Sequence, residues 1–379
     1  MIGFDLTEEQ KMLQRLVADM MERTCPRDKV REMDEQEVYP RELYQEMARV
    51  GLLGLPFPEQ YGGTNGSMLD VAIILEALAK RWTAAAEIYI LSISNVGRFI
   101  LRFGTPEQLD YYLPRLIHGE ITFCLALTEP NAGSDLASLT TRAVADGDHF
   151  IVNGAKIFST QAHQADWMFA AVRTTKGEKK HQGITMMLID AKSPGIEIRP
   201  IKKLGQKAVA TCEVSFTDVY VPRSCVLGEV DNGWNILKHH FEMGRVGTAA
   251  VATGIAQAAL DDAVAYAKER VQFDQYIKEF QSIQHILADM AMRIHASRLM
   301  THYAAWHIDQ RIPCLKEAAM AKTTATDTAM WCTTNGIQVL GGYGYTMEFD
   351  MQRYFRDCKI LQIAGGSNQI QRNIIARML

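Results

Sequence analysis

Hydroxyl, amide and carboxylate side chains gather in one short stretch near residue 130, FCLALTEPNAGSD, which runs from Phe123 to Asp135. The hydroxyls of Thr128 and Ser134 can donate and accept hydrogen bonds. Gly133 lets the backbone approach a ligand closely, because it has no Cβ atom. This combination suits a planar heterocycle, although a stretch of this kind standing alone is more often a plain polar loop.

A second candidate stretch is glycine-rich. QVLGGYGY, from Gln338 to Tyr345, offers Gly341 and Gly342 together with the side-chain amide of Gln338. Glycines followed by amide donors suit a pyrophosphate held close to the backbone. A bare GGxG is a weak signal, so its interpretation depends on what lies around it.

The third candidate is a lone carboxylate, Glu87, in the apolar stretch AAAEIYILSISNVGRF from Ala84 to Phe99. Apolar surroundings raise the pKa of a carboxylate and make it a stronger general base. The ordinary alternative is a partly exposed residue that pairs with Arg81 or Arg98. We keep both interpretations open at this point.

Hydrophobic periodicity divides the chain into three parts. Residues 1–118 have helical spacing, and Thr7 with Gln10 forms a capping box at the first helix. Residues 119–230 contain short alternating apolar runs separated by glycine and charged turns, which predict a β domain. Residues 231–379 return to helical spacing. The predicted class is α+β, with a β domain between two helical domains.

Composition excludes several classes of function. A net charge of −4 with interspersed signs offers no basic face for nucleic acid. No unbroken apolar run reaches the roughly 18 residues of a membrane span, so we expect a cytoplasmic protein. No spacing of histidines and cysteines predicts a metal site. The cysteines are odd in number, which favours reduced thiols, and they are Cys25, Cys124, Cys212, Cys225, Cys314, Cys332 and Cys358.

The end of the chain carries a family signature. RDCKILQIAGGSNQIQR, from Arg356 to Arg372, follows the glycine-rich stretch by a short interval. With the polar loop near residue 130, it resembles the acyl-CoA dehydrogenases, flavoproteins that take a proton from C2 and a hydride from C3 of an acyl-CoA thioester. The resemblance covers essentially the whole chain. It implies an N-terminal helical domain, a barrel-like middle β domain and a C-terminal four-helix bundle, bound FAD, a homotetramer, an acyl-CoA substrate and electron transfer to an electron-transfer flavoprotein.

The resemblance also implies which residues contact FAD, including contacts made across a subunit interface by Arg270, Phe273 and Gln281. NGAKIFST, from Asn153 to Thr160, matches the family's second flavin strand. For Phe158, packing in the core is the alternative. The implied FAD contacts are Leu127, Thr128, Gly133, Ser134, Phe158, Thr160, Arg270, Phe273, Gln281, Gln338, Gly341, Gly342, Ser367 and Gln369.

The same motifs lack the usual base. Most family members have a glutamate directly before the glycine that matches Gly366, and here that position is Gly365. Other members carry the glutamate on an earlier helix, before the arginine that matches Arg245, and here that position is Gly244. Gly244 is either native or a laboratory substitution in an otherwise common pattern. Neither glycine can take a proton from carbon.

The acyl pocket implied by the resemblance is lined by the helix that carries Glu87. At i, i+4 and i+8, Glu87, Leu91 and Asn95 share one face of an α-helix. Glu87 is therefore the candidate catalytic base, acting on a carbon other than C2. The implied substrate contacts are Leu91, Asn95, Ser134, Gly244, Arg245, Gly365 and Gly366. For Arg245 an interhelical salt bridge is the alternative.

Two kinds of relative also lack the usual glutamate, and each suggests a different reaction. The cyclohexene-carboxyl-CoA dehydrogenases use an acidic residue on this same helix, which is compatible with Glu87. The 3-sulfinopropionyl-CoA desulfinases, which expel sulfite without net oxidation, carry an arginine at the position we align with Glu87, and a glutamate there would repel a sulfinate. The favoured reaction is therefore FAD-dependent dehydrogenation with a displaced base. A non-oxidising lyase and a base-deficient ordinary dehydrogenase, native or engineered, remain the alternatives.

Overall fold

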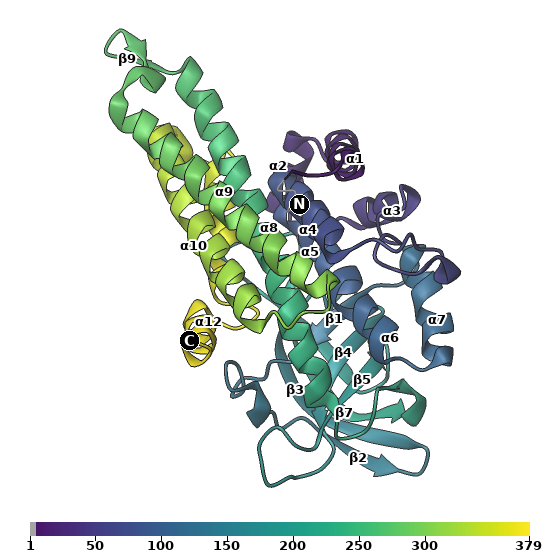
Figure 1. Ribbon diagram of the computed structural model, residues 1–379. Coiled ribbons are helices and arrows are strands. Elements are labelled where there is room, and N and C mark those ends of the chain that lie inside the picture. Colours follow the sequence, from purple (N-terminus) through teal and green to yellow (C-terminus); the bar gives the residue numbers. More distant parts are fainter. Residues whose placement is uncertain (1–4) are drawn as a thin grey trace.

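A computed structural model describes residues 5–379 and shows three packed units, a group of N-terminal helices, a central sheet and a set of long C-terminal helices (Figure 1). This confirms the predicted α+β class. The capping box of Thr7 and Gln10 starts the first helix as expected. The N-terminal helices are α1 (Glu8–Thr24), α2 (Arg27–Glu35), α3 (Arg41–Arg49), α4 (Met68–Arg81), α5 (Thr83–Tyr89), α6 (Arg98–Phe103) and α7 (Pro106–Ile117).

A π-helical segment, η2 (Ile90–Gly97), joins α5 to α6. The continuous run Thr83–Phe103 is long and apolar enough to cross a membrane, but 83% of its apolar window is buried inside the protein, as in a core helix. The prediction that no apolar stretch is long enough was therefore wrong. It considered only unbroken runs, whereas this helical run continues through Glu87 and Arg98.

The middle of the chain forms one mostly antiparallel sheet in the order β6-β7-β3-β2-β4-β5-β8, with β1 paired to β4 in parallel. Alternating apolar residues build these strands, and their inward faces form a separate small core. The strands are β1 (Phe123–Ala126), β2 (Arg142–Asp146), β3 (His149–Thr160), β4 (Trp167–Arg173), β5 (Ile184–Asp190), β6 (Ile196–Ile201), β7 (Thr211–Pro222) and β8 (Val226–Leu227).

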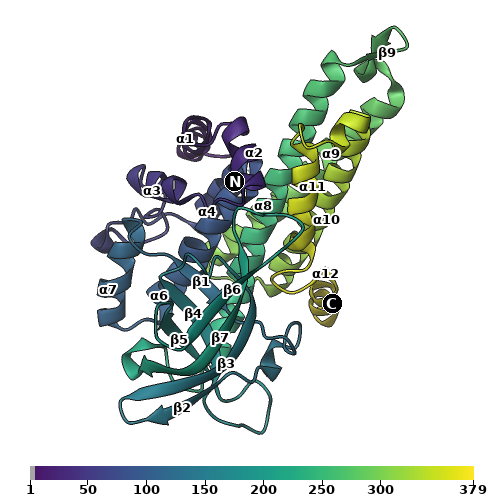
Figure 2. The same cartoon turned by 180° about the vertical axis from the view of Figure 1, so that it is seen from behind.

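The C-terminal part is built on three long helices, with α11 lying along them (Figure 2). A small hairpin of β9 and β10 lies at their far tip, away from the sheet (Figure 1). Six of the seven cysteines are buried and all seven are free, as predicted. The elements are α8 (Gly233–Glu269), β9 (Val271–Gln272), β10 (Gln275–Tyr276), α9 (Gln281–Asp309), α10 (Leu315–Leu340), α11 (Met351–Lys359) and α12 (Asn368–Arg377).

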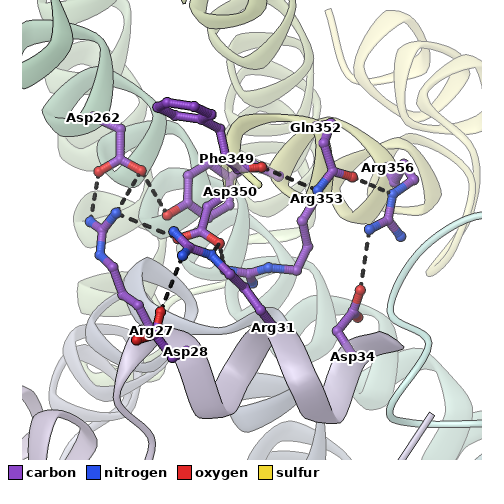
Figure 3. A network of polar contacts seen from close by, with 11 residues as sticks. Arg27, Asp28, Arg31, Asp34, Asp262, Phe349, Asp350, Gln352, Arg353 and Arg356 are labelled. Carbon is purple, nitrogen blue, oxygen red and sulfur yellow. Dashed lines mark hydrogen bonds and ion pairs between the residues drawn. The ribbon is translucent and has the colours of Figure 1, made fainter. Parts of the chain in front are cut away.

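An ion-pair network ties the N-terminal helix α2 to the C-terminal part (Figure 3). Arg27 pairs with Asp262 of α8 at 2.6 Å, and Arg31 pairs with Asp350 at 2.9 Å. At the other end of α2, Asp34 accepts a hydrogen bond from Arg356 of α11 at 3.2 Å. The network fixes the N-terminal helices on the long helices that carry the candidate site.

Candidate active site

The polar loop near residue 130 lies against β3, the strand that contains the predicted second flavin segment, Asn153 to Thr160. The backbone N–H of Ile157 on β3 donates to the carbonyl oxygen of Thr128 at 2.8 Å. The structure therefore brings Leu127 and Thr128 next to the segment that carries Phe158 and Thr160. Gly133 lies beyond them, and a Cβ atom there would meet nothing within 4 Å.

A buried ion pair holds this loop to the strand. Lys156 Nζ lies 2.8 Å from Glu129 Oε1 and also donates to the carbonyl oxygen of Leu127 at 3.1 Å. Burial alone would raise the pKa of Glu129, but Lys156 and the donors of Thr140 and Thr141 outweigh burial and lower it to about 2. Burial lowers the pKa of Lys156 to about 8, despite the opposing effect of Glu129. The pair fixes the loop without contributing a free charge.

This pair was not predicted from the sequence. The signal was the alternation in β3, where Phe150, Val152 and Lys156 all occupy inward positions. An inward-facing lysine requires a buried partner. The neighbouring loop supplies this partner, Glu129.

Phe158 is 62% exposed and has a φ of +59°. Core packing, the alternative interpretation of this residue, is therefore wrong. Its neighbour Thr160 faces Thr211 on β7, with their hydroxyl oxygens 3.3 Å apart. An exposed aromatic ring beside two hydroxyls and an open loop provides a face on which a planar ring system can lie.

The two positions that usually hold the base differ in their surroundings. Gly365 is exposed and has a φ of +66°, and a Cβ atom there would meet only the Thr248 hydroxyl oxygen, at 3.9 Å. Gly244 lies within α8, and its carbonyl oxygen accepts a hydrogen bond from the Thr248 hydroxyl at 2.8 Å. Both glycines therefore lie close to Thr248.

The turn after Gly365 is held from α10 and starts the last helix. Lys322 Nζ donates to the carbonyl oxygen of Gly366 at 3.0 Å and to Asn368 Oδ1 at 2.9 Å. Ser367 caps α12 by accepting from the N–H of Ile370 at 3.4 Å. In the described residues, the Ser367 side chain is thus used for capping, and Gln369 is exposed.

Arg245 is only 4% exposed, and its Nε and Nη1 atoms have no hydrogen-bond partner. Within residues 5–379 the structure shows no ion pair for it, so the alternative of an interhelical salt bridge is not found. Burial lowers the pKa of Arg245 to about 10, and Glu242 and Cys314 partly oppose that effect. Its ring contact is with Phe241, 5.4 Å away.

Glu87 lies at the end of α5 and is mostly buried. Neither cation considered as its partner pairs with it: Arg81 pairs with Glu22, and the contact shown for Arg98 is with the Met68 sulfur. Burial raises the pKa of Glu87, and the positive charge of Lys203 lowers it by a smaller amount. Among the described residues, Glu87 makes neither a hydrogen bond nor an ion pair.

Lys203 connects Glu87 to the rest of the site. Its Nζ donates to the Thr211 hydroxyl oxygen at 3.0 Å and to the carbonyl oxygen of Val209. Thr211 in turn faces Thr160. Glu87 therefore lies on the side of the N-terminal helices that faces the strand carrying Thr160 and Phe158.

Leu91 and Asn95 follow Glu87 but do not continue an α-helical stripe. Both lie in η2, whose hydrogen bonds join residues five apart, so the turn is wider than the predicted α-helix. Each is 5% exposed, and Asn95 Oδ1 has no hydrogen-bond partner. Such π segments occur frequently at functional sites. The predicted α-helical alignment was wrong because no sequence signal marked the π turn.

The glycine-rich stretch from Gln338 to Tyr345 lines a pocket of about 420 Å³ near the tip of the long helices. Arg270, Gly341 and Gly342 line it, and a Cβ atom on either glycine would meet nothing within 4 Å. Gln338 lines a neighbouring pocket of about 610 Å³. Phe273, at the end of the β9–β10 hairpin, is 89% exposed.

Within one chain the two groups of predicted FAD contacts do not meet. Arg270, Phe273 and the exposed Gln281 lie around the hairpin tip, whereas Thr128 and Phe158 belong to the sheet region at the other end of the molecule (Figure 1). The open glycine cradle suits a pyrophosphate, and the exposed ring and hydroxyls suit a flavin ring, so the residues present fit FAD. In one chain these residues form two separate half-sites, one suited to the pyrophosphate and the other to the flavin ring.

Comparison with known proteins identifies the chain. Models of the acyl-CoA dehydrogenase N-terminal, middle and C-terminal domains match residues 7–120, 124–219 and 231–379. The chain belongs to the acyl-CoA dehydrogenase family. A probable acyl-CoA dehydrogenase of Bacillus subtilis is 37% identical over 379 residues, covering 100% of each chain.

Other members of the family agree with this assignment. Subunit CarC of the caffeyl-CoA reductase–Etf complex of Acetobacterium woodii is 36% identical, covering 98% of each chain. Butyryl-CoA dehydrogenase of Megasphaera elsdenii superposes with a TM-score of 0.96 at 37% identity, covering 100% of this chain and 99% of that one. This family member is thus an FAD-dependent oxidoreductase of the acyl-CoA dehydrogenase type.

Proposed function

We propose that this acyl-CoA dehydrogenase uses Glu87 as a displaced catalytic base, on an acyl group from which the proton leaves a carbon other than C2. The observation that carries the proposal is that Glu87, which is half-buried, makes neither a hydrogen bond nor an ion pair among residues 5–379, while glycines occupy positions 244 and 365. A carboxylate that is partly withdrawn from water and has no partner is a candidate for a functional site.

The surroundings of Glu87 suit a general base. Burial raises its pKa, which brings it nearer to neutral pH and makes the carboxylate a stronger proton acceptor. The positive charge of Lys203 opposes that rise, because it favours the carboxylate form. Leu91 and Asn95 supply an apolar and a polar wall on the same helical run. Bound FAD would accept the hydride in this reaction.

The two half-sites support a shared cofactor. Because the residues at the hairpin tip lie far from the sheet in one chain, the tip of one subunit would complete the FAD site of another. A homotetramer, as the resemblance implies, provides such contacts between subunits. The exposed Phe273 at the tip is the kind of side chain that a subunit interface buries.

We further propose that the reduced enzyme passes electrons to an electron-transfer flavoprotein in the cytoplasm. Support comes from the related CarC subunit, which is part of a complex with such a flavoprotein. The alternative of a non-oxidising lyase predicts turnover without an electron acceptor. A base-deficient ordinary dehydrogenase predicts binding of acyl-CoA thioesters without reduction of FAD.

The first experiment is an anaerobic screen of linear and cyclic acyl-CoA thioesters for bleaching of the bound FAD. With the substrate that reduces FAD fastest, Glu87→Gln should keep the flavin spectrum and the affinity for that thioester. It should slow flavin reduction by at least about a hundredfold, because removal of a general base typically costs 10² to 10⁴ in rate.

Glu76→Gln is the matched control. Glu76 is also mostly buried, but it pairs with Arg298 at 2.7 Å, so its role is structural. Flavin reduction in this variant should stay within a few-fold of the parent. If Glu87→Gln also stays within a few-fold, Glu87 is not the base and the proposal fails.

A further inference from the structure

The β6–β7 loop, residues 202–210, is bound by α11 on both sides of one residue. The backbone N–H of Gln206 donates to Asp357 Oδ1 at 2.5 Å. Arg356, the preceding residue of α11, donates through Nη1 to the carbonyl oxygen of Leu204 at 3.2 Å. A segment that has no helix or strand of its own is thus held in place by a C-terminal helix.

Gly205 lies between these two contacts and allows the loop to approach α11 very closely. A Cβ atom on Gly205 would lie 2.4 Å from the carbonyl oxygen of Arg356, closer than side chains come to a backbone atom. The next residue, Gln206, has a φ of +52°, which is uncommon for a residue other than glycine. Such a conformation persists where surrounding contacts determine it. The contacts with α11 therefore fix the shape of the loop as well as its place.

Asp357 is fully buried at this contact. Burial and the nearby charge of Asp34 raise the pKa of Asp357, and the guanidinium of Arg353, one turn earlier on α11, opposes them (Figure 3). A buried carboxylate is costly unless it is paired or hydrogen-bonded. Among residues 5–379 the structure shows one hydrogen bond to the Asp357 side chain, and its donor is the loop residue Gln206.

The loop also carries Lys203, the cation that acts on Glu87. Lys203 Nζ donates to the Thr211 hydroxyl oxygen at 3.0 Å and to the carbonyl oxygen of Val209. Its positive charge lowers the pKa of Glu87, against the effect of burial. Lys203 directly precedes the residues that α11 binds. A loop that separates from α11 therefore displaces the backbone of Lys203.

Several charged groups surround Lys203. Burial lowers the pKa of Lys203, and four groups on different elements oppose that effect, the first of them the largest: Glu87 of α5, Asp357 of α11, Cys212 of β7 and Asp34 of α2. The side chain thus has more than one acidic group that can attract it. The position of the loop decides how much of its charge reaches Glu87.

We propose that Asp357 of α11 and Gly205 of the loop are positioning residues for Glu87, because they hold the β6–β7 loop where Lys203 stays beside that carboxylate. The inference rests on the proposed function, in which Glu87 is the base. It extends the candidate site to α11 through backbone contacts and the charge of Lys203.

A purely structural role for Asp357 predicts a different result. Loss of a structural contact lowers stability and leaves the pKa of Glu87 unchanged. Loss of the negative charge of Asp357 lowers the pKa of any acid that this charge reaches. Withdrawal of Lys203 raises the pKa of Glu87, because a favourable positive charge moves away. The direction of the change therefore separates positioning from both alternatives.

The test measures the pKa of Glu87 without turnover. Infrared spectra of the FAD-loaded enzyme are recorded across pH with Glu87 present and with Glu87→Gln, and their difference follows the carboxyl band of Glu87. Asp357→Ala should raise the pKa of Glu87 by up to about one pH unit, the lower end of what a nearby opposite charge supplies. In a Lys203→Met background the same substitution should add little, because the charge that it positions is gone.

Asp357→Asn is the matched variant. It also removes the negative charge, but its side-chain oxygen can still accept from the N–H of Gln206. It should restore most of the pKa of Glu87 that Asp357→Ala disturbs. Equal changes in the two variants would show that the charge of Asp357, and not its hold on the loop, acts on Glu87, and would overturn the inference.

Gly205→Ala tests the contact with every charge retained. Its Cβ atom must push the loop away from the α11 backbone, so the pKa of Glu87 should rise as in Asp357→Ala. Leu204→Ala is the loop control, because the Leu204 side chain is 59% exposed and its backbone contact remains. It should leave the pKa of Glu87 unchanged. If Asp357→Ala does not fold, Gly205→Ala still decides, and an unchanged pKa of Glu87 in a folded Gly205→Ala contradicts the inference.

Asp350→Ala controls for general loosening around α11. Asp350 directly precedes α11 and is also buried, but it pairs with Arg31 of α2 and does not bind the loop. This variant should melt at a lower temperature without raising the pKa of Glu87. A rise as large as that in Asp357→Ala would show that any loosening of α11 has this effect, and the inference would fail.

The pH profile of flavin reduction, measured on the same variants with the thioester from the screen, separates this inference from the proposed function. If the pKa of Glu87 rises and the acid limb of the profile moves with it, both stand. If the pKa of Glu87 rises while the acid limb stays fixed, the loop positions Lys203 as proposed but Glu87 is not the base. If only Lys203→Met raises the pKa of Glu87, the positioning inference fails and the proposed function is untouched.

Discussion

The loop at Glu129 and the turn at Gly365 differ in whether their buried charged side chains have ion-pair partners. At the first, Lys156 meets a carboxylate at 2.8 Å, and the Thr140 and Thr141 donors satisfy the carboxylate further. At the second, Arg245 has free donors and no ion pair. A satisfied pair fixes a segment, whereas the buried guanidinium of Arg245 has no such partner among the described residues.

The network in Figure 3 also pairs its buried charges, although the Nε and Nη1 atoms of Arg353 have no hydrogen-bond partner among the described residues. Asp350 is 3% exposed and has Arg27, Arg31 and Arg353 around it, and these contacts outweigh burial and lower its pKa. It lies where α2 packs on the long helices. Its charges balance locally, which indicates a structural role. The difference between the regions predicts different consequences of substitution.

The largest expected effect is on the paired region. Lys156→Met leaves Glu129 charged and buried, and removing one partner of a buried pair typically costs about 3–5 kcal/mol. The denaturation midpoint in urea should fall accordingly, and FAD should dissociate more easily because the loop is released. The double variant Glu129→Gln/Lys156→Met removes both charges and should recover part of the loss. A single variant as stable as the parent would show that the pair does not hold the loop.

Much of this molecule could be predicted from its sequence. The change from helical spacing to alternation and back predicted the order of helices, sheet and helices, since burial follows those periods. The missing glutamate at position 365 could be recognised from the sequence because Gly365 lies within the family signature from Arg356 to Arg372. Positions such as Phe158 and Gly341 could be placed by the same motifs, because backbone geometry and exposure there follow from short-range sequence.

Other features depend on contacts that no local pattern contains. The η2 segment has an ordinary apolar sequence, so its π turn arises from packing against neighbours. Lys203 lies more than a hundred residues from Glu87, and only the folded structure brings its charge to that carboxylate. The lack of a partner for Arg245 is equally invisible in sequence, because it is a property of everything packed around it.

A smaller effect is expected where the half-sites meet between subunits. Arg270 lines the glycine pocket at the hairpin tip, 5.8 Å above the ring of Tyr343. Arg270→Ala should weaken FAD binding by about 10- to 100-fold if the guanidinium contacts a phosphate, because hydrogen bonds between charged groups contribute about 1.5–3 kcal/mol. Since bound FAD would join two subunits, dissociation of the oligomer should increase with it.

Lys268→Ala is the control for that variant, because Lys268 lies in the same last turn of α8 but outside the pocket. It should alter neither property. Fluorescence titration of the apoprotein with FAD measures the affinity, and sedimentation velocity measures the oligomeric state. A variant at position 270 that changes neither quantity argues against a shared cofactor site.

The smallest expected effect concerns the charge beside Glu87. Flavin reduction requires the carboxylate form, so its rate should rise with pH through the pKa of Glu87. Lys203 lowers that pKa by favouring the charged form, while burial raises it. Lys203→Met removes the favourable charge, so the acid limb of the pH profile should move to higher pH while the rate at high pH changes little. Lys202→Met, at an exposed neighbouring position, should leave the profile in place. An acid limb that stays fixed or moves to lower pH in Lys203→Met would mean that the group titrating in the reaction is not Glu87.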